Sequence, residues 1–120
     1  MFDIDGKTIG IYEKPYIIAE LSANHGGQIA NAKAAIRIAK ESGASAIKIQ
    51  SYTPDTITIK SDKPSFVINE GVWKGRTLYD VYSEGYTPFE WHEQLFTHAR
   101  SLGVEILSTP FDESAADLLE

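Results

Sequence analysis

Residues 16–50, YIIAELSANHGGQIANAKAAIRIAKESGASAIKIQ, contain two short apolar runs separated by a segment with helical periodicity. The first run, residues 16–21, shows no alternation of apolar and polar residues, which predicts a strand covered on both faces. Gly43 stands where the following helix would be capped, and residues 45–50 predict a second strand. The helix itself is predicted from apolar residues at helical spacing, which are Ile29, Ala32, Ile36 and Ala39. Such a strand–helix–strand unit predicts two parallel strands.

A second helix is expected to begin at Thr87. This residue would act as the N-cap, Pro88 would be the first helical residue, and Glu90 would complete a capping box. Gly103 would end the helix. Its apolar face would comprise His92, Leu95, Phe96, Ala99 and Leu102.

The remaining segments complete an alternation of strands and helices. Residues 2–14 are compatible with a small hairpin, and residues 104–107 predict a third short strand. Asp112 is expected to cap one more helix, which would begin with Ala115 and Ala116. Residues 51–87 are irregular, with one short helix expected over residues 76–84, and they are either a functional loop or a harmless insertion. The order of elements predicts an α/β fold with a parallel sheet.

The composition excludes several classes of function. The 120 residues carry a formal net charge of −6, which argues against a nucleic-acid surface. No cysteine is present, so disulfides, thiolate metal sites and thiol nucleophiles are excluded. The N-terminus is too polar for a signal peptide, and no apolar stretch approaches the roughly 20 residues that span a bilayer. We therefore expect a soluble, cytoplasmic protein.

Polar residues stand at the carboxyl end of every predicted strand. Glu20 and Ser22 end the first strand, Lys48 and Gln50 the second, and Ser108 and Thr109 the third. Residues two apart in a strand share a face, so Lys48 and Gln50 are expected to point one way, and so are Glu20 and Ser22. Ligands bind at the carboxyl ends of strands in open α/β sheets and in (β/α)₈ barrels.

This pattern has two interpretations. In the first, Glu20 and Lys48 form only a structural ion pair between neighbouring strands. In the second, they belong to a ligand site. Lys48, the Thr109 hydroxyl and the backbone N–H groups after Asp112 would suit an anionic group. Glu20, Gln50, Asn24 and His25 would suit a hydroxyl-rich ligand or proton transfer.

The three histidines lack the spacing of a metal motif. His25 lies beside Glu20 in the loop after the first strand, where a site role and a structural role are equally plausible. His92 falls on the apolar face of its helix and is expected to be a core residue, whereas His98 is expected to be exposed. The aromatic residues within 73–91 are expected to pack locally rather than to stack on bases.

With these residues placed, the sequence resembles the sialic acid synthase family. The similarity lies in IAELSANHGG, AIKIQSYTPDTIT and ILSTPFDESAADLLE, and it covers nearly the whole chain beyond residue 12. GVWKGRTLYDVYSEGYTPFEWHEQLFTHAR is closer to the pseudaminic acid synthase branch of that family. Gly26 stands where the family usually has asparagine.

The resemblance implies a (β/α)₈ TIM barrel, of which this chain would be the N-terminal part with about three βα units. The family's antifreeze-like C-terminal domain, which caps the partner's site in a homodimer, would lie outside residues 1–120. It also implies condensation of phosphoenolpyruvate with an N-acetylated amino sugar. For this branch the sugar would be 2,4-diacetamido-2,4,6-trideoxy-altropyranose and the products pseudaminic acid and phosphate. A divalent metal, Mn²⁺ or Mg²⁺, would polarise the sugar aldehyde through ligands outside this chain.

Roles follow from the motifs that match. Glu20, in A-E-L-S-x-N-H, would contact sugar hydroxyls and move a proton. Lys48 and Gln50, in I-K-x-Q, would hold phosphoenolpyruvate and the sugar respectively, and Thr109, in S-T-P-F-D, would contact phosphoenolpyruvate. Asn24 and His25 belong to the first motif and are predicted to bind substrate.

Two alternatives remain open at this point. The family could be right and the sugar different, which would make the activity that of an N-acetylneuraminate or legionaminate synthase. The chain could instead be a non-catalytic fragment that only associates with itself or with the missing portion. In either case we expect residues 1–120 alone to be inactive, because most of the metal and ligand shell would be absent.

Overall fold

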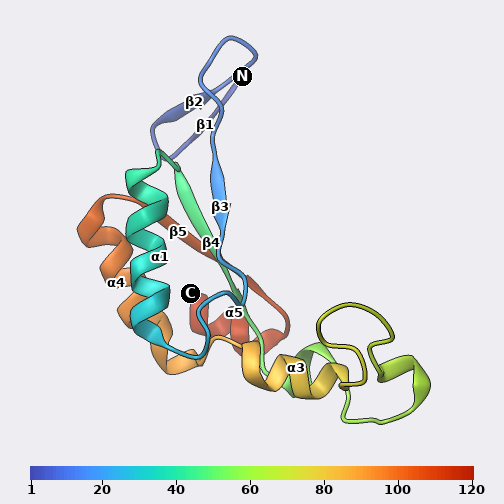
Figure 1. The fold of residues 1–120 in the computed structure, drawn as a ribbon. Helices are drawn as coiled ribbons and strands as arrows, with labels where there is room; N and C mark the ends of the chain where they lie inside the picture. The colour runs from blue at the N-terminus through green and yellow to red at the C-terminus, as the bar shows by residue number, and fades with distance from the viewer.

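The computed structural model describes residues 1–120 as two small sheets and a set of helices (Figure 1). The strands are β1 (Phe2–Ile4), β2 (Lys7–Ile9), β3 (Ile18–Glu20), β4 (Ala46–Ser51) and β5 (Glu105–Pro110). The helices are α1 (Ile29–Glu41), α2 (Pro54–Ile57), α3 (Leu78–Gly85), α4 (His92–Leu102) and α5 (Glu113–Leu119), with 3₁₀ turns η1 (Pro64–Phe66) and η2 (Phe89–Trp91). β3, β4 and β5 form a parallel sheet in that order, which confirms the predicted α/β class.

The N-terminal hairpin is confirmed as an antiparallel pair of β1 and β2. Asp5 and Gly6 connect the strands, and both have positive φ angles, of 46° and 75°. Two such residues give a turn whose twist matches that of the strands. The Gly6 N–H donates to the Asp3 carboxylate at 2.7 Å. In Figure 1 this hairpin lies at the opposite end of the molecule from α3.

One face of the parallel sheet is covered by α1 and α4, which lie side by side on it (Figure 1). The predicted stripe of α1 points into this layer, where Ala32 and Ile36 are completely buried. Ile47 and Ile49 of β4 meet them from the sheet, and Leu95 of α4 closes the cluster. Burial of a side chain of this size stabilises the fold by about 1.5–3 kcal/mol.

The opposite face of the sheet is open. Ile18 in β3 is 48% exposed and Leu107 in β5 is 38% exposed. The prediction that the first strand is covered on both faces is therefore wrong for this chain. Helices pack on one face only, so Ala19 and Leu21 contact the core while Ile18 faces solvent. The open face also carries Glu20, Lys48, Gln50 and Thr109, whereas Ser108 lies on the covered side, with its hydroxyl 2.6 Å from that of the buried Ser51.

The start of α4 differs from the prediction. Thr87 is buried and does not cap the helix, because its hydroxyl lies 3.3 Å from Nε2 of His25. Pro88 has a ψ angle of 136°, which is not helical, and a 3₁₀ turn precedes the α-helix at His92. The apolar face and the end of the helix are as predicted, with Gly103 in the left-handed conformation at φ 66°.

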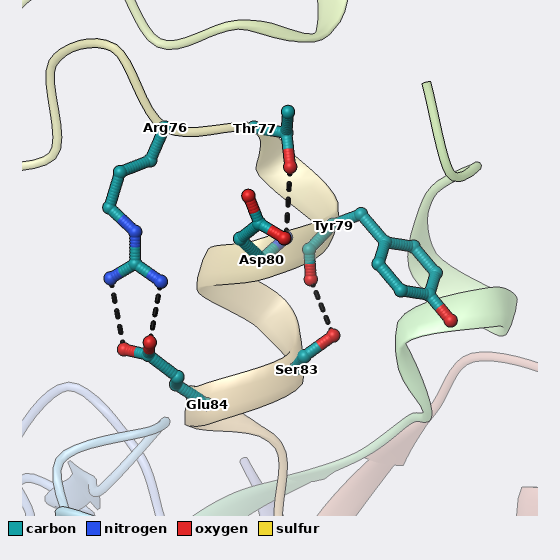
Figure 2. A network of polar contacts seen from close by, with 6 residues as sticks. All are labelled: Arg76, Thr77, Tyr79, Asp80, Ser83 and Glu84. Carbon is teal, nitrogen blue, oxygen red and sulfur yellow. Dashed lines mark hydrogen bonds and ion pairs between the residues drawn. The ribbon is translucent and has the colours of Figure 1, made fainter. Parts of the chain in front are cut away.

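The segment between β4 and α4 is more ordered than expected. The helix predicted over residues 76–84 is observed as α3, which begins at Leu78 because the Thr77 hydroxyl accepts a hydrogen bond from the Asp80 N–H (Figure 2). Arg76 and Glu84 join the two ends of this region through two hydrogen bonds of 2.9 and 2.5 Å. The fold contains no helix with the length and apolar character needed to cross a membrane.

Candidate functional site

The centre of the candidate site is an ion pair between β3 and β4. Glu20 and Lys48 are register partners in the parallel sheet, and Nζ of Lys48 lies 2.8 Å from Oε2 of Glu20. Their side chains remain 38% and 37% exposed. A pair this accessible contributes at most about 1 kcal/mol to stability. The ion pair of the first interpretation is thus present but contributes little to stability. Because it lies on the open face, both groups remain within reach of a ligand.

The second carboxylate oxygen of Glu20 is held by the residue that turns the chain. Oε1 accepts hydrogen bonds from the N–H and the hydroxyl of Ser22, at 3.1 and 3.2 Å. Ser22 has a φ angle of 49°, an uncommon conformation for a residue with a side chain. Ser22 thus contacts Glu20 through a left-handed turn beyond the end of β3, and not through the strand alternation from which a shared face was predicted.

Gln50 and Thr109 extend the site by one step toward the carboxyl edge. They are register partners between β4 and β5, two residues beyond the partners Lys48 and Leu107. Side chains two apart share a face, so Gln50 lies on the same face as Lys48. The structure thus brings Glu20, Lys48, Gln50 and Thr109 together at one edge of the sheet.

Asn24 and His25 lie in the loop between β3 and α1 but differ in accessibility. Asn24 is exposed, and its amide donates to the Leu21 carbonyl at 3.0 Å. His25 is 1% exposed: Nδ1 accepts from the Gly27 N–H at 3.1 Å, so Nε2 carries the proton shared with the Thr87 hydroxyl. Burial lowers the pKa of His25, with an opposing contribution from the Gly85 carbonyl. The observed contacts are structural, and a substrate-binding role for His25 stays a prediction.

His92 is a core residue, as predicted, and it locks the sheet from the covered side. Its Nδ1–H donates to the Pro88 carbonyl at 3.2 Å, so Nε2 accepts from the Ser51 hydroxyl at 2.6 Å. Ser51 is in turn 2.6 Å from the Ser108 hydroxyl, which joins β4 to β5. Burial lowers the pKa of His92, so the ring is neutral in the folded protein. These contacts fix the backbone directly behind Gln50 and Thr109.

The structure contradicts the expected exposure of His98 and bears on the expected anion site at the start of α5. His98 is half-buried rather than exposed, and its Nε2 lies 3.1 Å from the Lys33 carbonyl, to which it donates. At the start of α5, the Asp112 side chain already takes up one of the backbone N–H groups that were expected to suit an anion. The Asp112 carboxylate accepts from the Ala115 N–H and the Ser114 hydroxyl, and the latter bond chiefly lowers the Asp112 pKa. A negative charge thus already lies at this helix end, and anion binding there stays a prediction.

No three His, Cys, Asp or Glu side chains within residues 1–120 are close enough to hold a metal ion. Glu20 is the one acidic group among the residues described above as the site, and its two oxygens already bind Lys48 and Ser22. These residues do not fit a metal centre by themselves. The expected divalent metal, with ligands outside this chain, stays a prediction.

Comparison with known proteins gives the family. The sequence profile of the NeuB family matches residues 35–120, which is more than half of the chain. This chain belongs to the NeuB family. Over 108 residues, 90% of its length, it is 47% identical to a pseudaminic acid synthase of Campylobacter jejuni, and it covers 32% of that protein. It is 36% identical to an N,N'-diacetyllegionaminic acid synthase of Legionella pneumophila over 87% of its length, covering 29% of that relative.

A solved structure extends the similarity to the fold. The spore coat polysaccharide biosynthesis protein SpsE of Bacillus subtilis superimposes with a TM-score of 0.67 and 34% identity, over 98% of this chain and 30% of that one. The fold is therefore part of the TIM-barrel type. The chain spans about a third of the length of the curated relatives it matches.

Sequence reasoning did not identify the hydroxyls behind the site. Ser51 and Ser108 were not connected to His92, although Ser51 follows Gln50 directly. The sequence signal that could have identified Ser51 was the alternation of apolar and polar residues in β4. Residues at even positions face outward, so a serine at position 51 must lie on the covered side and needs a buried partner.

Proposed function

We propose that residues 1–120 form the N-terminal part of the barrel domain of a nonulosonic acid synthase, which condenses phosphoenolpyruvate with an N-acetylated amino sugar. The proposed sugar is 2,4-diacetamido-2,4,6-trideoxy-altropyranose, and the products are pseudaminic acid and phosphate. The observation that carries the proposal is the cluster of Glu20, Lys48, Gln50 and Thr109 on one open sheet edge. The 47% identity to a pseudaminic acid synthase supports the choice of sugar.

The ion pair prepares Lys48 for an anionic substrate. An ammonium group has three N–H donors, and the Glu20 carboxylate occupies one direction. The remaining donors can bind the carboxylate or phosphate of phosphoenolpyruvate from the open face, with the Thr109 hydroxyl as a neighbouring contact. The ammonium would then offset the charge that the departing phosphate carries.

Glu20 has the complementary role. Its carboxylate is fixed by Ser22 and Lys48, so it presents a defined acceptor on the same face of the sheet as Gln50. In the proposed reaction, C3 of phosphoenolpyruvate forms a bond to the sugar aldehyde carbon, whose oxygen takes up a proton. Water then adds at C2, and phosphate leaves with cleavage of the C–O bond. Glu20 would orient a sugar hydroxyl and carry one of these protons.

Further parts are needed for this chemistry. TIM barrels have eight strands and about 250 residues, whereas the parallel sheet here has three strands. We propose that the remaining strands, the divalent-metal ligands and an antifreeze-like C-terminal domain complete the enzyme, as a homodimer in the cytoplasm. The polypeptide in which residues 1–120 are joined to those parts is called the complete protein.

The test is phosphate release by the complete protein with phosphoenolpyruvate and each candidate sugar. We expect turnover with the diacetamido-trideoxy-altropyranose, and a loss of at least about 100-fold in kcat/KM for Lys48→Ala and for Glu20→Gln. Lys33→Ala is a matched control, since Lys33 bonds Gln94 between the covering helices. Near-normal turnover in both site variants would refute the assignment of the site.

The second candidate is a legionaminic acid synthase, favoured by the 36% identity to the Legionella pneumophila protein. Higher kcat/KM with a legionaminic acid precursor than with the altropyranose would select it. The site residues would keep the same roles, because the phosphoenolpyruvate half of the reaction is shared. N-acetylmannosamine serves as the third sugar in the same assay.

A further inference from the structure

A groove of about 680 Å³ adjoins the candidate site on the side of α3. It lies between the loop that follows β3, the end of β4 and the segment from Ile68 to Gly85. Asn24 and Gln50, both assigned above to sugar binding, line it, so the groove continues directly from the site. Its volume is typical of small-molecule sites.

The groove has apolar walls and few charges. Seven of its thirteen lining residues are hydrophobic, among them Leu78 and Val81 of α3 and Trp73, which is 53% exposed. Glu84 is the one charged residue in the lining, and Arg76 already pairs with it. No lysine or arginine lines the groove, so it is unsuited to a phosphate or carboxylate.

The walls are built from ordered parts. Tyr52 is 3% exposed and contacts the rings of Tyr82 and Phe111 edge to face, at centroid distances of 5.7 and 5.4 Å. The bonds between Arg76 and Glu84 span α3 and hold its start to its end (Figure 2). The groove is therefore formed before any ligand arrives.

Gly85 sets the distance between α3 and the loop after β3. A Cβ atom at this position would lie 3.1 Å from the Cβ of Ala23 and 3.8 Å from the Tyr52 hydroxyl. Glycine permits this approach, which brings the apolar side chains of α3 beside Asn24. The two amides and the apolar wall consequently face the same space.

We infer that this groove binds the methyl-bearing substituents, acetamido or 6-deoxy, of the amino sugar and thereby selects the sugar. The inference rests on the proposed function for the identity of the ligand. Amide groups of Asn24 and Gln50 suit the acetamido N–H and C=O, and the apolar wall suits the methyl groups. A methyl group lost from an apolar pocket reduces kcat/KM about 10–200-fold, which is enough to separate related sugars.

The kinetic test uses the complete protein and a variant that fills the groove. Val81→Phe is expected to lower kcat/KM for the diacetamido sugar at least about tenfold while the KM of phosphoenolpyruvate changes less than about twofold. Val72→Phe is the matched control, because Val72 is 91% exposed and does not line the groove. Trp73→Ala is expected to lower kcat/KM for the sugar as well. Because Trp73 is exposed at the rim of the groove, this substitution should not impair folding. Unchanged sugar kinetics in both groove variants would overturn the inference.

Sugar analogues locate the methyl group. Analogues with an N-formyl group at each nitrogen, and an analogue with a 6-hydroxyl group, are compared with the parent sugar. Each analogue is expected to lower kcat/KM in the wild-type protein if the methyl group it lacks binds in the groove. The analogue that no longer lowers kcat/KM in Val81→Phe identifies the bound substituent. If every analogue lowered kcat/KM by the same factor in the wild type and in Val81→Phe, the inference would be contradicted.

Saturation-transfer NMR with the same sugars separates this inference from the proposed function. If saturation transfer to the sugar methyl protons is strong in the wild type and absent in Val81→Phe, the groove binds these methyl groups, even if no phosphate is released. If phosphate release is normal but no such transfer is observed, the inference about the groove is refuted while the proposed function stands.

Discussion

The two faces of the three-stranded sheet differ in almost every physical property. On the covered face, Ile47 and Ile49 pack under α1 and α4 and are almost completely buried. On the open face, Lys48 and Gln50 alternate with them along the same strand and remain accessible. One set of residues in this strand thus supplies stability, and the other set is the one to which we assign chemistry in the proposed function. Substitutions at adjacent positions should therefore affect different measurements.

The largest effect is expected from adjacent substitutions in β4. Ile49→Ala should lower the free energy of unfolding by about 2–5 kcal/mol, because it leaves a cavity among Ile36, Leu95 and Leu21. Gln50→Ala should cost less than about 1 kcal/mol and raise the KM of the sugar instead. Denaturant titration and kinetics of the complete protein measure both. Equal destabilisation by the two variants would contradict the claim that the covered face alone stabilises the fold.

A smaller effect is expected from pH, and it belongs to the covered face. His25 and His92 are buried and neutral, with lowered pKa values, whereas the unfolded chain takes up a proton at each near pH 6.5. Stability should therefore be complete above about pH 6.5 and fall as the pH decreases, by at most about 1.4 kcal/mol per pH unit for each histidine.

His92→Gln tests the origin of this dependence. The variant should be less stable at pH 7, because the bond to Ser51 is altered, but its stability should fall less steeply from pH 7 to pH 5. A slope identical to that of wild type would show that the buried ring does not titrate as described.

The smallest effect is expected at Gly26, beside the open face. Gly26 has a φ angle of 57°, and a Cβ there would meet only Asn31 Nδ2, at 3.8 Å. Asparagine tolerates this left-handed conformation better than other side chains, so Gly26→Asn should change stability by less than about 1 kcal/mol. Gly26→Val should be clearly more destabilising, because a β-branched residue is strained there. Thermal melts of the two variants decide the point, and equal melting temperatures would contradict it.

The elements with strong local signals could be predicted from the sequence. Helical periodicity and a terminal glycine located α1, and the Asp112 cap located α5. Local rules failed where a distant residue competed for the same group. Thr87 has the position of an N-cap, but His25, 62 residues earlier in the chain, takes its hydroxyl.

The site could be predicted only in part. Strand alternation placed Lys48 and Gln50 on one face, and the order of the parallel strands placed Glu20 beside Lys48. The groove could not be derived, because it depends on how the irregular segment from Ile68 to Gly85 folds back on the sheet. Its clearest sequence signal was the aromatic residues within 73–91, which were expected to pack locally.

The central claim is that Lys48 on the open sheet edge binds an anionic substrate. Equilibrium binding of phosphoenolpyruvate to the complete protein, without sugar, tests it in wild type, Lys48→Met and Lys33→Met. Both substitutions remove one positive charge, but Lys33 lies between the covering helices beside Gln94. The account predicts at least about tenfold weaker binding in Lys48→Met, since a hydrogen bond from a charged group contributes about 1.5–3 kcal/mol, and unchanged binding in Lys33→Met. Equal affinity of Lys48→Met and wild type would contradict it.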